Sequence, residues 1–349
     1  MPRIVPETEK IARHRAFWQR ADVDRPLLGT TIATFPSVSA VTADGILTPD
    51  DLDVETNVRE LEAEWQAWSP VSGDAVWVAN PLWAFPWHLA IAGCPIQRDG
   101  ENLWGLPFIE SWDQLERIAF SPDNPWFVKL TEFVRALVAS SRGRYPIGSG
   151  QLMLGPVDMM MQARGQEALA VDLYDAPERV RELAARCTRL VVEATRAQQA
   201  ITPRYMGGYA GTIRYVWAPG PLVESAEDIS FMMSPSLHRE FVAPMHRALA
   251  REFPYTIIHL HSAQLHTVPS LLEVDEVAAV QITPDFGEDM LKYLPILASI
   301  LEKKPLILHG VMPVDSVHEL MRRLPHRGLC IFVRCDTPDD GARTLDALI

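Results

Sequence analysis

The sequence predicts a (β/α)8 barrel. In the second half of the chain, short apolar runs near 256–261, 277–283, 305–311 and 329–335 alternate with helical patterns. Such alternation implies parallel strands joined by helices. Four earlier strand-like runs bring the number to eight, which is the number of strands in this barrel class. The 349 residues exceed the ~250 of a typical barrel. We therefore expect one domain over 1–349, with insertions early in the chain.

Each element has its own signal in the sequence. Residues 1–25 form a helical extension with an amphipathic segment at 8–21, and the helix after 48–51 begins with Thr-Pro-Asp-Asp and places Val58, Leu61, Trp65 and Trp68 on one face. The four earlier strands are expected near 27–34, 74–80, 145–154 and 204–210. The helices are expected near 112–141, 158–200, 225–253, 270, 288–303, 314–324 and 339–348.

Charge and composition exclude several classes of protein. The formal charge of -13 argues against a nucleic-acid or anionic-membrane surface, because those partners are bound by clustered Lys and Arg. No uncharged run reaches the ~20 residues that span a bilayer, and residues 1–25 are unlike a secretory signal. Cys94, Cys187 and Cys330 are interpreted as small reduced hydrophobes. We expect a cytoplasmic protein.

The stretch 255–266, YTIIHLHSAQLH, contains three histidines. His259 and His261 are two residues apart, so on a strand both imidazoles leave from the same face. This spacing suits two metal ligands or two acid-base groups, and it equally suits a hydrogen-bonded pair inside a polar barrel mouth. His266 is interpreted as a solvated residue of the following turn.

Alternation along the last strands indicates which side chains face the barrel interior. Outward positions must be apolar to meet the helices. Ile258 and Leu260 therefore point outward on the fifth strand, as do Val280 and Ile282 on the sixth and Leu306 and Leu308 on the seventh. The inward positions are then Gln281, Thr283 and Asp285 on the sixth strand, and Ile307 and His309 on the seventh.

The eighth strand is ambiguous, because both of its faces are largely apolar. One parity carries Ile331, Val333 and Cys335, and the other carries Cys330, Phe332 and Arg334. If the first set faces inward, Cys335 lies at the rim of the barrel mouth. The candidate site is then His259, His261, Asp285, His309 and Cys335.

Two imidazoles and a thiolate with one open position match a catalytic zinc site. We expect His259, His261 and Cys335 as the metal ligands. Asp285 would orient an imidazole or contact substrate. Asp285 or His309 would manage protons as the catalytic residue, unless His309 is simply a hydrogen-bonded core residue.

Aromatic and proline residues are dense at 81–88, directly after the strand expected at 74–80. Such a stiff loop suits a pocket wall, or else it simply covers the barrel end. We expect Trp83, Trp87, Met153 and Tyr209 to line the substrate pocket.

Five phrases resemble the uroporphyrinogen decarboxylase superfamily, whose members include zinc-dependent methylcobalamin:thiol methyltransferases and related corrinoid demethylation enzymes. The phrases are FPWHLAIAGCPI (85–96), LGPVDMMMQARG (154–165), DLYDAPERVRELA (172–184), EDISFMMSPSLHREFVAPMHRAL (227–249) and HLHS (259–262). Known members have a (β/α)8 barrel, which agrees with the strand count.

The resemblance implies the methyltransferase branch more than true decarboxylation. The decarboxylase branch carries an Arg-Gln-Ala-Gly-Arg loop, whereas this chain reads RPLLGTTIATFPS at 25–37. The methyltransferase branch binds zinc through a His-x-Cys pair and a further Cys near the last strand. Here those positions read His259-Leu260-His261 and Cys335. With one thiolate fewer, the metal would be a stronger Lewis acid.

Three functions follow from these observations. The first is a zinc-dependent methyltransferase that moves a methyl group between a small O-, N- or S-methyl compound and a corrinoid carried by a partner protein. The second is a metal-free decarboxylase or lyase with Asp285 and the histidines as acid-base groups and Arg164 or Arg214 as anchors. The third is a non-catalytic barrel that binds a small molecule. A homodimer is expected as the assembly.

Overall fold

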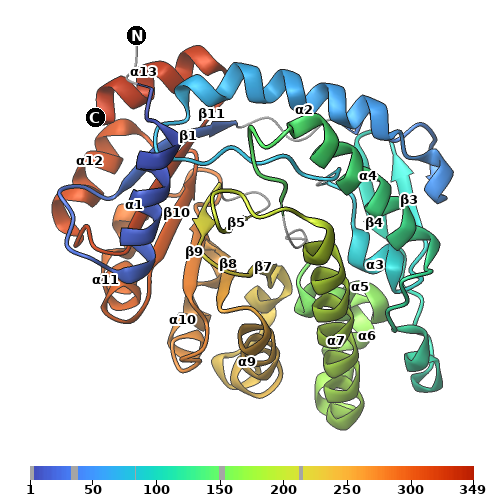
Figure 1. The fold of residues 1–349 in the computed structure, drawn as a ribbon. Coiled ribbons are helices and arrows are strands. Elements are labelled where there is room, and N and C mark those ends of the chain that lie inside the picture. The colour runs from blue at the N-terminus through green and yellow to red at the C-terminus, as the bar shows by residue number, and fades with distance from the viewer. Residues whose placement is uncertain (1–3, 33–37, 83, 149–153, 212–214) are drawn as a thin grey trace.

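The fold is a barrel of parallel strands surrounded by helices, seen in a computed structural model that describes residues 4–32, 38–82, 84–148, 154–211 and 215–349 (Figure 1). Six strands form one parallel sheet in the order β1-β11-β10-β9-β8-β7. Their bounds are β1 (Leu27–Ile32), β7 (Leu222–Ala226), β8 (Tyr255–His261), β9 (Ala279–Thr283), β10 (Leu306–Gly310) and β11 (Leu329–Cys335). The predicted barrel class is confirmed.

Two further segments pair with each other, and one of them with Ala210, through isolated parallel bridges. One bridge pairs Ala79 with Ile147, and another pairs Gly148 with Ala210. These segments match the strands predicted near 74–80 and 145–154, as far as the described residues extend. Gly155 then meets β7: a Cβ built there would lie 2.2 Å from the carbonyl oxygen of Ala226. The chain therefore closes from the first strands round to β7.

The strand predicted at 204–210 is observed only at its end, where Ala210 forms the parallel bridge to Gly148, and it does not belong to the six-stranded sheet. Its end forms β5 (Tyr209–Ala210), which pairs antiparallel with β6 (Trp217–Ala218). The strand beside β8 is β7, whose last two residues we had assigned to the helix expected near 225–253. An antiparallel excursion, β2 (Gly45–Ile46), β3 (Ile96–Asp99) and β4 (Asn102–Gly105), lies outside the barrel.

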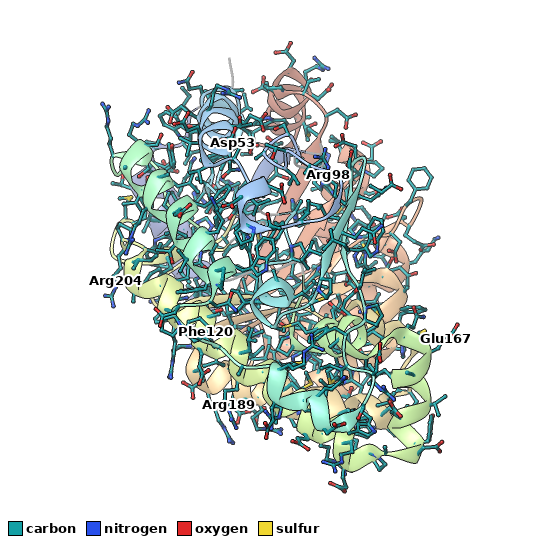
Figure 2. All side chains as sticks on the ribbon, turned by 90° about the vertical axis from the view of Figure 1, so that its right-hand side faces the viewer. Asp53, Arg98, Phe120, Glu167, Arg189 and Arg204 are labelled. Carbon is teal, nitrogen blue, oxygen red and sulfur yellow. The ribbon has the colours of Figure 1, made fainter. Side chains whose placement is uncertain are left out.

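Helices follow the strands round the outside (Figure 1). Their bounds are α1 (Glu7–Gln19), α2 (Val54–Trp68), α3 (Trp87–Ile91), α4 (Pro125–Ser141), α5 (Pro156–Arg164), α6 (Gln166–Asp175), α7 (Pro177–Ile201), α8 (Pro235–Leu237), α9 (Ala243–Glu252), α10 (Val268–Leu271), α11 (Leu294–Lys303), α12 (Val314–Arg323) and α13 (Pro338–Leu348). Asp53 caps α2 by accepting from the backbone N–H groups of Glu55 and Thr56, and Figure 2 shows it on the outer surface.

Two apolar layers flank the sheet, as strand alternation requires. The outer layer contains Ile258, Leu260, Val280, Ile282, Leu306, Leu308, Ile331 and Val333. The inner layer contains Leu27, Leu222, Ile257, Ala279, Ile307, Cys330 and Phe332, and Phe17 of α1 packs against it. Because most of these inner residues occur early in their strands, α1 covers the amino-terminal end of the barrel. The carboxyl ends carry the polar side chains.

In the part of the chain that the structure describes, no helix combines the length and the apolar character that crossing a membrane requires.

Candidate metal centre

Three ligand-type side chains converge at the carboxyl ends of the neighbouring strands β7 and β8. His259 and His261 are on β8, and Asp228 begins the short helical turn Asp228–Met232 that follows β7. One ligand atom from each lies within 4.8 Å of the other two. His259 is 7% exposed, whereas His261 and Asp228 are 36% and 55% exposed. The group therefore opens toward solvent on one side, as a catalytic metal site does.

Hydrogen bonds orient the His259 ring so that its Nε2 atom faces the other candidate ligands. The Nε2 amide of Gln281 donates to the Thr283 hydroxyl at 3.1 Å, so the amide oxygen of Gln281 accepts from Nδ1 of His259. The lone pair of His259 is then on Nε2, 3.9 Å from Asp228 Oδ1. Metal-binding imidazoles are held in this way, by a hydrogen bond from the nitrogen that does not bind the ion.

Asp285 orients His261 in the same manner. Its Oδ1 accepts from His261 Nδ1 at 2.9 Å, and its Oδ2 accepts from the Ser262 hydroxyl at 2.6 Å and the Ala263 N–H at 2.9 Å. Burial acts to raise the pKa of Asp285, but these hydrogen bonds and the His261 imidazole outweigh it and hold the pKa below its ordinary value. Two oriented imidazoles and the Asp228 carboxylate are donors that fit a zinc ion.

A pocket of about 370 Å³ adjoins this group. Carboxylates and apolar side chains share its wall, and Phe231 at its edge is 55% exposed. The lining residues are Met161, Gln166, Asp228, Ile229, Phe231, His261, Ala263, Gln264 and Asp285. Substrate bound in this space would lie directly beside the candidate ligands.

Two acidic residues of the site were missed in the sequence. Asp228 follows a segment that we had not recognised as a strand. Asp158 lies on α5 between Val157 and Met159, and an acidic residue among apolar neighbours was the available signal. Its Oδ1 accepts from the Ile229 N–H at 3.1 Å, whereas Oδ2 is buried without a hydrogen-bond partner among the described residues. Burial, and next the charge of Asp228, raise the pKa of Asp158 well above its usual value.

The structure does not bring Cys335 to the group. The register pairs Leu308 with Ile331, and both pack in the outer layer, so Cys335 also faces outward. Its Sγ lies 3.7 Å from Thr344 Oγ1 on α13, and burial raises the pKa of the thiol. The prediction that Cys335 is the third ligand is therefore wrong, because the inward parity of β11 belongs to Phe332.

His309 lies on the inner face of β10 and is 4% exposed. Its Nε2 is 2.8 Å from the Thr31 hydroxyl, and its ring lies against that of Tyr215, with 6.1 Å between the ring centroids. It belongs to neither group of converging ligand atoms that the described residues form. These contacts suit a hydrogen-bonded core residue, and a proton-transfer role for His309 stays a prediction.

Trp87 does not wall this pocket. Its side chain is fully buried, its Nε1 donates to the Pro81 carbonyl at 2.8 Å, and its ring packs against Phe85 with centroids 4.6 Å apart. The prediction that Trp87 contacts substrate is wrong because this aromatic loop fills the core between α3 and α4. Trp83 lies outside the described residues.

Tyr209 is also absent from the pocket. It packs against the inner layer, most of whose residues occur early in their strands, and the guanidinium of Arg204 lies 5.8 Å from its ring centroid. Arg204 projects from the outer edge of the molecule in Figure 2. The prediction for Tyr209 took residues 204–210 as the strand beside β8, a place that β7 holds. Met153 lies outside the described residues.

The predicted anchor Arg164 is occupied elsewhere. It donates to Asp172 at 2.7 Å and to the carbonyl oxygens of Ile109 and Glu110, and its guanidinium lies over Trp112. It does not line the pocket beside the histidines, which removes support for its use as a carboxylate anchor. Arg214, the other predicted anchor, lies outside the described residues.

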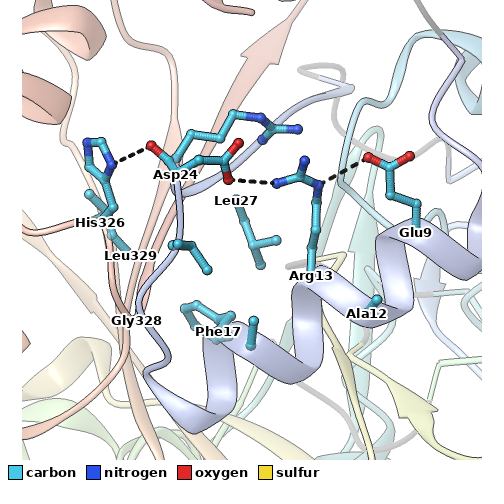
Figure 3. A pocket seen from close by; sticks show the side chains of 12 residues that line it. Glu9, Ala12, Arg13, Phe17, Asp24, Leu27, His326, Gly328 and Leu329 are labelled. Atoms are coloured by element: carbon cyan, nitrogen blue, oxygen red, sulfur yellow. Dashed lines mark hydrogen bonds and ion pairs between the residues drawn. The ribbon is translucent and has the colours of Figure 1, made fainter.

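A second pocket, of about 350 Å³, lies between α1 and the starts of β1 and β11 (Figure 3). Arg13 pairs there with Asp24 at 3.6 Å and with Glu9 at 3.4 Å, and His326 Nδ1 is 3.0 Å from the Asp24 carbonyl oxygen. Because this pocket is at the amino-terminal end of the strands, it is separate from the candidate metal centre.

Comparisons with known proteins give a match in structure alone. No family model and no curated protein matches the sequence. A methyltransferase from Methanosarcina mazei superposes with a TM-score of 0.64 at 11% identity, covering 98% of this chain and 96% of that one. A B12-independent methionine synthase from Shewanella sp. W3-18-1 aligns with a TM-score of 0.41 at 11% identity over 62% of this chain and 64% of that one, which is too low to carry an argument. The first similarity shows that the barrel is shared.

Proposed function

We propose that the chain is a zinc-dependent methyltransferase acting on a small O-, N- or S-methyl compound. The observation that carries the proposal is the convergence of His259 and His261, each oriented through its Nδ1, with Asp228 at the carboxyl end of the barrel. The fold shared with a methyltransferase supports it. The other carrier of the methyl group would be a corrinoid on a partner protein. This assignment rests on the sequence resemblance.

Asp228, His259 and His261 would hold the zinc ion. A bound zinc ion would supply a Lewis acid for the atom that gains or loses the methyl group. Gln281 and Asp285 keep the two imidazoles in the ligating tautomer. Asp285 therefore acts as a positioning residue in this proposal and not as a proton carrier.

Protons are assigned to two other residues. Asp158 is a buried carboxyl near Asp228 whose pKa is raised by burial and by the charge of Asp228, and His309 faces the barrel interior. Either can exchange a proton with a substrate that extends into the barrel mouth. The pocket wall carries Met161 and Phe231 for the apolar part of the substrate.

Metal content and methyl transfer to free cob(I)alamin, measured on the purified chain, test the proposal. We expect stoichiometric zinc, and transfer from at least one donor in a panel of methyl ethers, methylamines and methyl thioethers. His259→Ala should lose both the zinc of this site and transfer, whereas the matched change Cys335→Ala should keep the metal. Unaltered metal content in His259→Ala would contradict the metal site, and zinc binding without turnover across the panel would favour a non-catalytic barrel.

A further inference from the structure

A second group of ligand-type residues lies behind the candidate metal centre. Glu227, His238 and His246 each have no exposed side-chain surface. One ligand atom from each lies within 4.8 Å of the other two. Glu227 directly precedes Asp228, so two consecutive acidic residues after β7 contribute to two separate groups.

An unusual helical turn brings the two histidines together. His238 and His246 are eight residues apart, and at 3.6 residues per turn such a pair diverges by about 80°. The segment His238–Val242 is a π-helix, whose wider turn accommodates additional residues before α9 begins. This turn compensates for the spacing, so both imidazoles reach the same carboxylate. Single π-helical turns within helices are rare and are frequent at functional sites.

The two contacts of the Ser270 hydroxyl favour a proton on Nδ1 of His238. The Ser270 hydroxyl donates to the Thr267 carbonyl at 2.8 Å, so the hydroxyl accepts from His238 Nδ1 at 2.7 Å. In the neutral tautomer, Nε2 of His238 then carries a lone pair, directed at a Glu227 oxygen 3.2 Å away. With the proton on Nδ1, two lone pairs face each other, and they need either a further proton on Nε2 or a metal ion between them.

The surroundings resemble those of a bound metal ion. Nε2 of His246 contacts the other oxygen of Glu227. Ser230 Oγ lies 3.3 Å from the first oxygen, so a fourth oxygen donor is next to the group. Ligands of a tetrahedral zinc ion lie roughly 3.4 Å apart when each is ~2.1 Å from the metal. The His238 Nε2–Glu227 contact of 3.2 Å is close to that separation, whereas His246 Nε2 lies closer to its Glu227 oxygen, so that side chain would have to move slightly to admit an ion.

We propose that Glu227, His238 and His246 bind a second divalent ion of the zinc type, which serves a structural role. Its ligands are closed off from solvent, as those of structural zinc ions are, and so it would enter as the chain folds. By holding Glu227 it would also fix the backbone of Asp228, the next residue. This inference does not depend on the proposed methyl transfer.

Crystals of the unaltered protein grown with zinc provide the direct test. Anomalous difference density at the zinc absorption edge should appear between Glu227, His238 and His246, in addition to any peak at His259 and His261. Density at His259 and His261 alone, or at neither site, would show that the buried group is an imidazolium–carboxylate pair and would overturn the proposal.

Metal counting on variants provides an independent measurement. The unaltered chain should contain two zinc ions, and His259→Ala combined with His261→Ala should retain one. His246→Gln should lose one ion, whereas His266→Gln, which changes an exposed histidine bonded to the Met233 carbonyl, should lose none. Full zinc content in His246→Gln would contradict the inference. If the unaltered chain contained the buried ion but none at His259 and His261, that result would instead count against the proposed function.

Discussion

At the scale of single residues, the candidate centre depends on which nitrogen of each imidazole is protonated. Gln281 and Asp285 accept from the Nδ1 atoms of His259 and His261, so both Nε2 atoms can bind an ion. A histidine without such a partner would sample both tautomers and more ring orientations. The residues around the ligands thus contribute to affinity without touching the ion.

Asp285→Asn should weaken zinc binding by about 10- to 100-fold, because the charge that orients His261 is lost while the ligands remain. Competition with a chromogenic chelator measures this affinity. The matched control is Asp289→Asn, since Asp289 caps a short helical turn at the Leu291 N–H and Asn caps equally well. Equal affinities in the two variants would show that Asp285 does not position a ligand.

How far the sequence could predict the site is clear from two strands. On β8, Ile258 and Leu260 alternate with two histidines, so the polar face could be recognised without a structure. On β11 both faces are apolar, and only the pairing of Leu308 with Ile331 decides which one faces inward. Register is a property of the assembled sheet, so the outward position of Cys335 could not be read from its own strand.

At the scale of elements, the half-buried carboxyl of Glu64 links α2 to the segment after it. Trp77 Nε1 donates to Glu64 at 3.0 Å, and burial raises the pKa of Glu64 to about 7. In the unfolded chain the group titrates near 4.5. Between these values the unfolded state releases a proton that the folded state keeps, so stability falls as pH rises from about 4.5 to about 7.

Glu64→Gln should therefore raise the free energy of unfolding by roughly 1–3 kcal/mol at pH 8 and change it little at pH 4. Urea unfolding at the two pH values measures the difference. Glu55→Gln on the exposed face of the same helix should instead destabilise slightly at pH 8, because it removes a charge from the helix amino terminus. A gain for Glu64→Gln that is equal at both pH values would contradict the linkage.

The junction between Gly155 and β7 closes the barrel next to the site. Gly155 has an ordinary φ of -67°, but an added Cβ would lie 2.2 Å from the Ala226 carbonyl and 2.3 Å from Ser225 Oγ. Gly155→Ala should cost about 3 kcal/mol or more and weaken metal binding, because β7 leads into Asp228. At Gly100 a Cβ meets nothing within 4 Å, so Gly100→Ala should cost only about 1 kcal/mol, for its positive φ. Thermal unfolding measures the stability of the two variants. Equal losses of stability would contradict the steric explanation.

The sequence of β7 explains why the strand beside β8 was mispredicted. The segment LVESA is short, and its polar Glu and Ser interrupt the apolar pattern that marks the other strands. The Pro-Gly-Pro sequence just before it was the available signal of a new element. Residues 204–210 looked comparable in sequence because hairpin strands and barrel strands share the same composition. Only pairing distinguishes β5 from β7.

At the scale of the whole molecule, the barrel has a structural end and a chemical end. The amino-terminal helix, expected to be an extension, is part of the structural end. Phe17 packs into the inner layer, Trp18 Nε1 donates to the Trp217 carbonyl at 2.7 Å, and buried Lys10 donates to Ser72. Both candidate metal sites lie at the opposite end, after β7 and β8.

This separation predicts that stability and metal binding can be changed independently. Phe17→Ala removes a 3% exposed ring from the inner layer and should lower the free energy of unfolding by about 3–5 kcal/mol. Tyr174→Ala, at a 72% exposed aromatic on α6, should change it by less than about 0.5 kcal/mol. Zinc content of the folded protein should be unchanged in both variants. Loss of zinc in folded Phe17→Ala would mean that the two ends are coupled through the strands, because no ligand contacts Phe17.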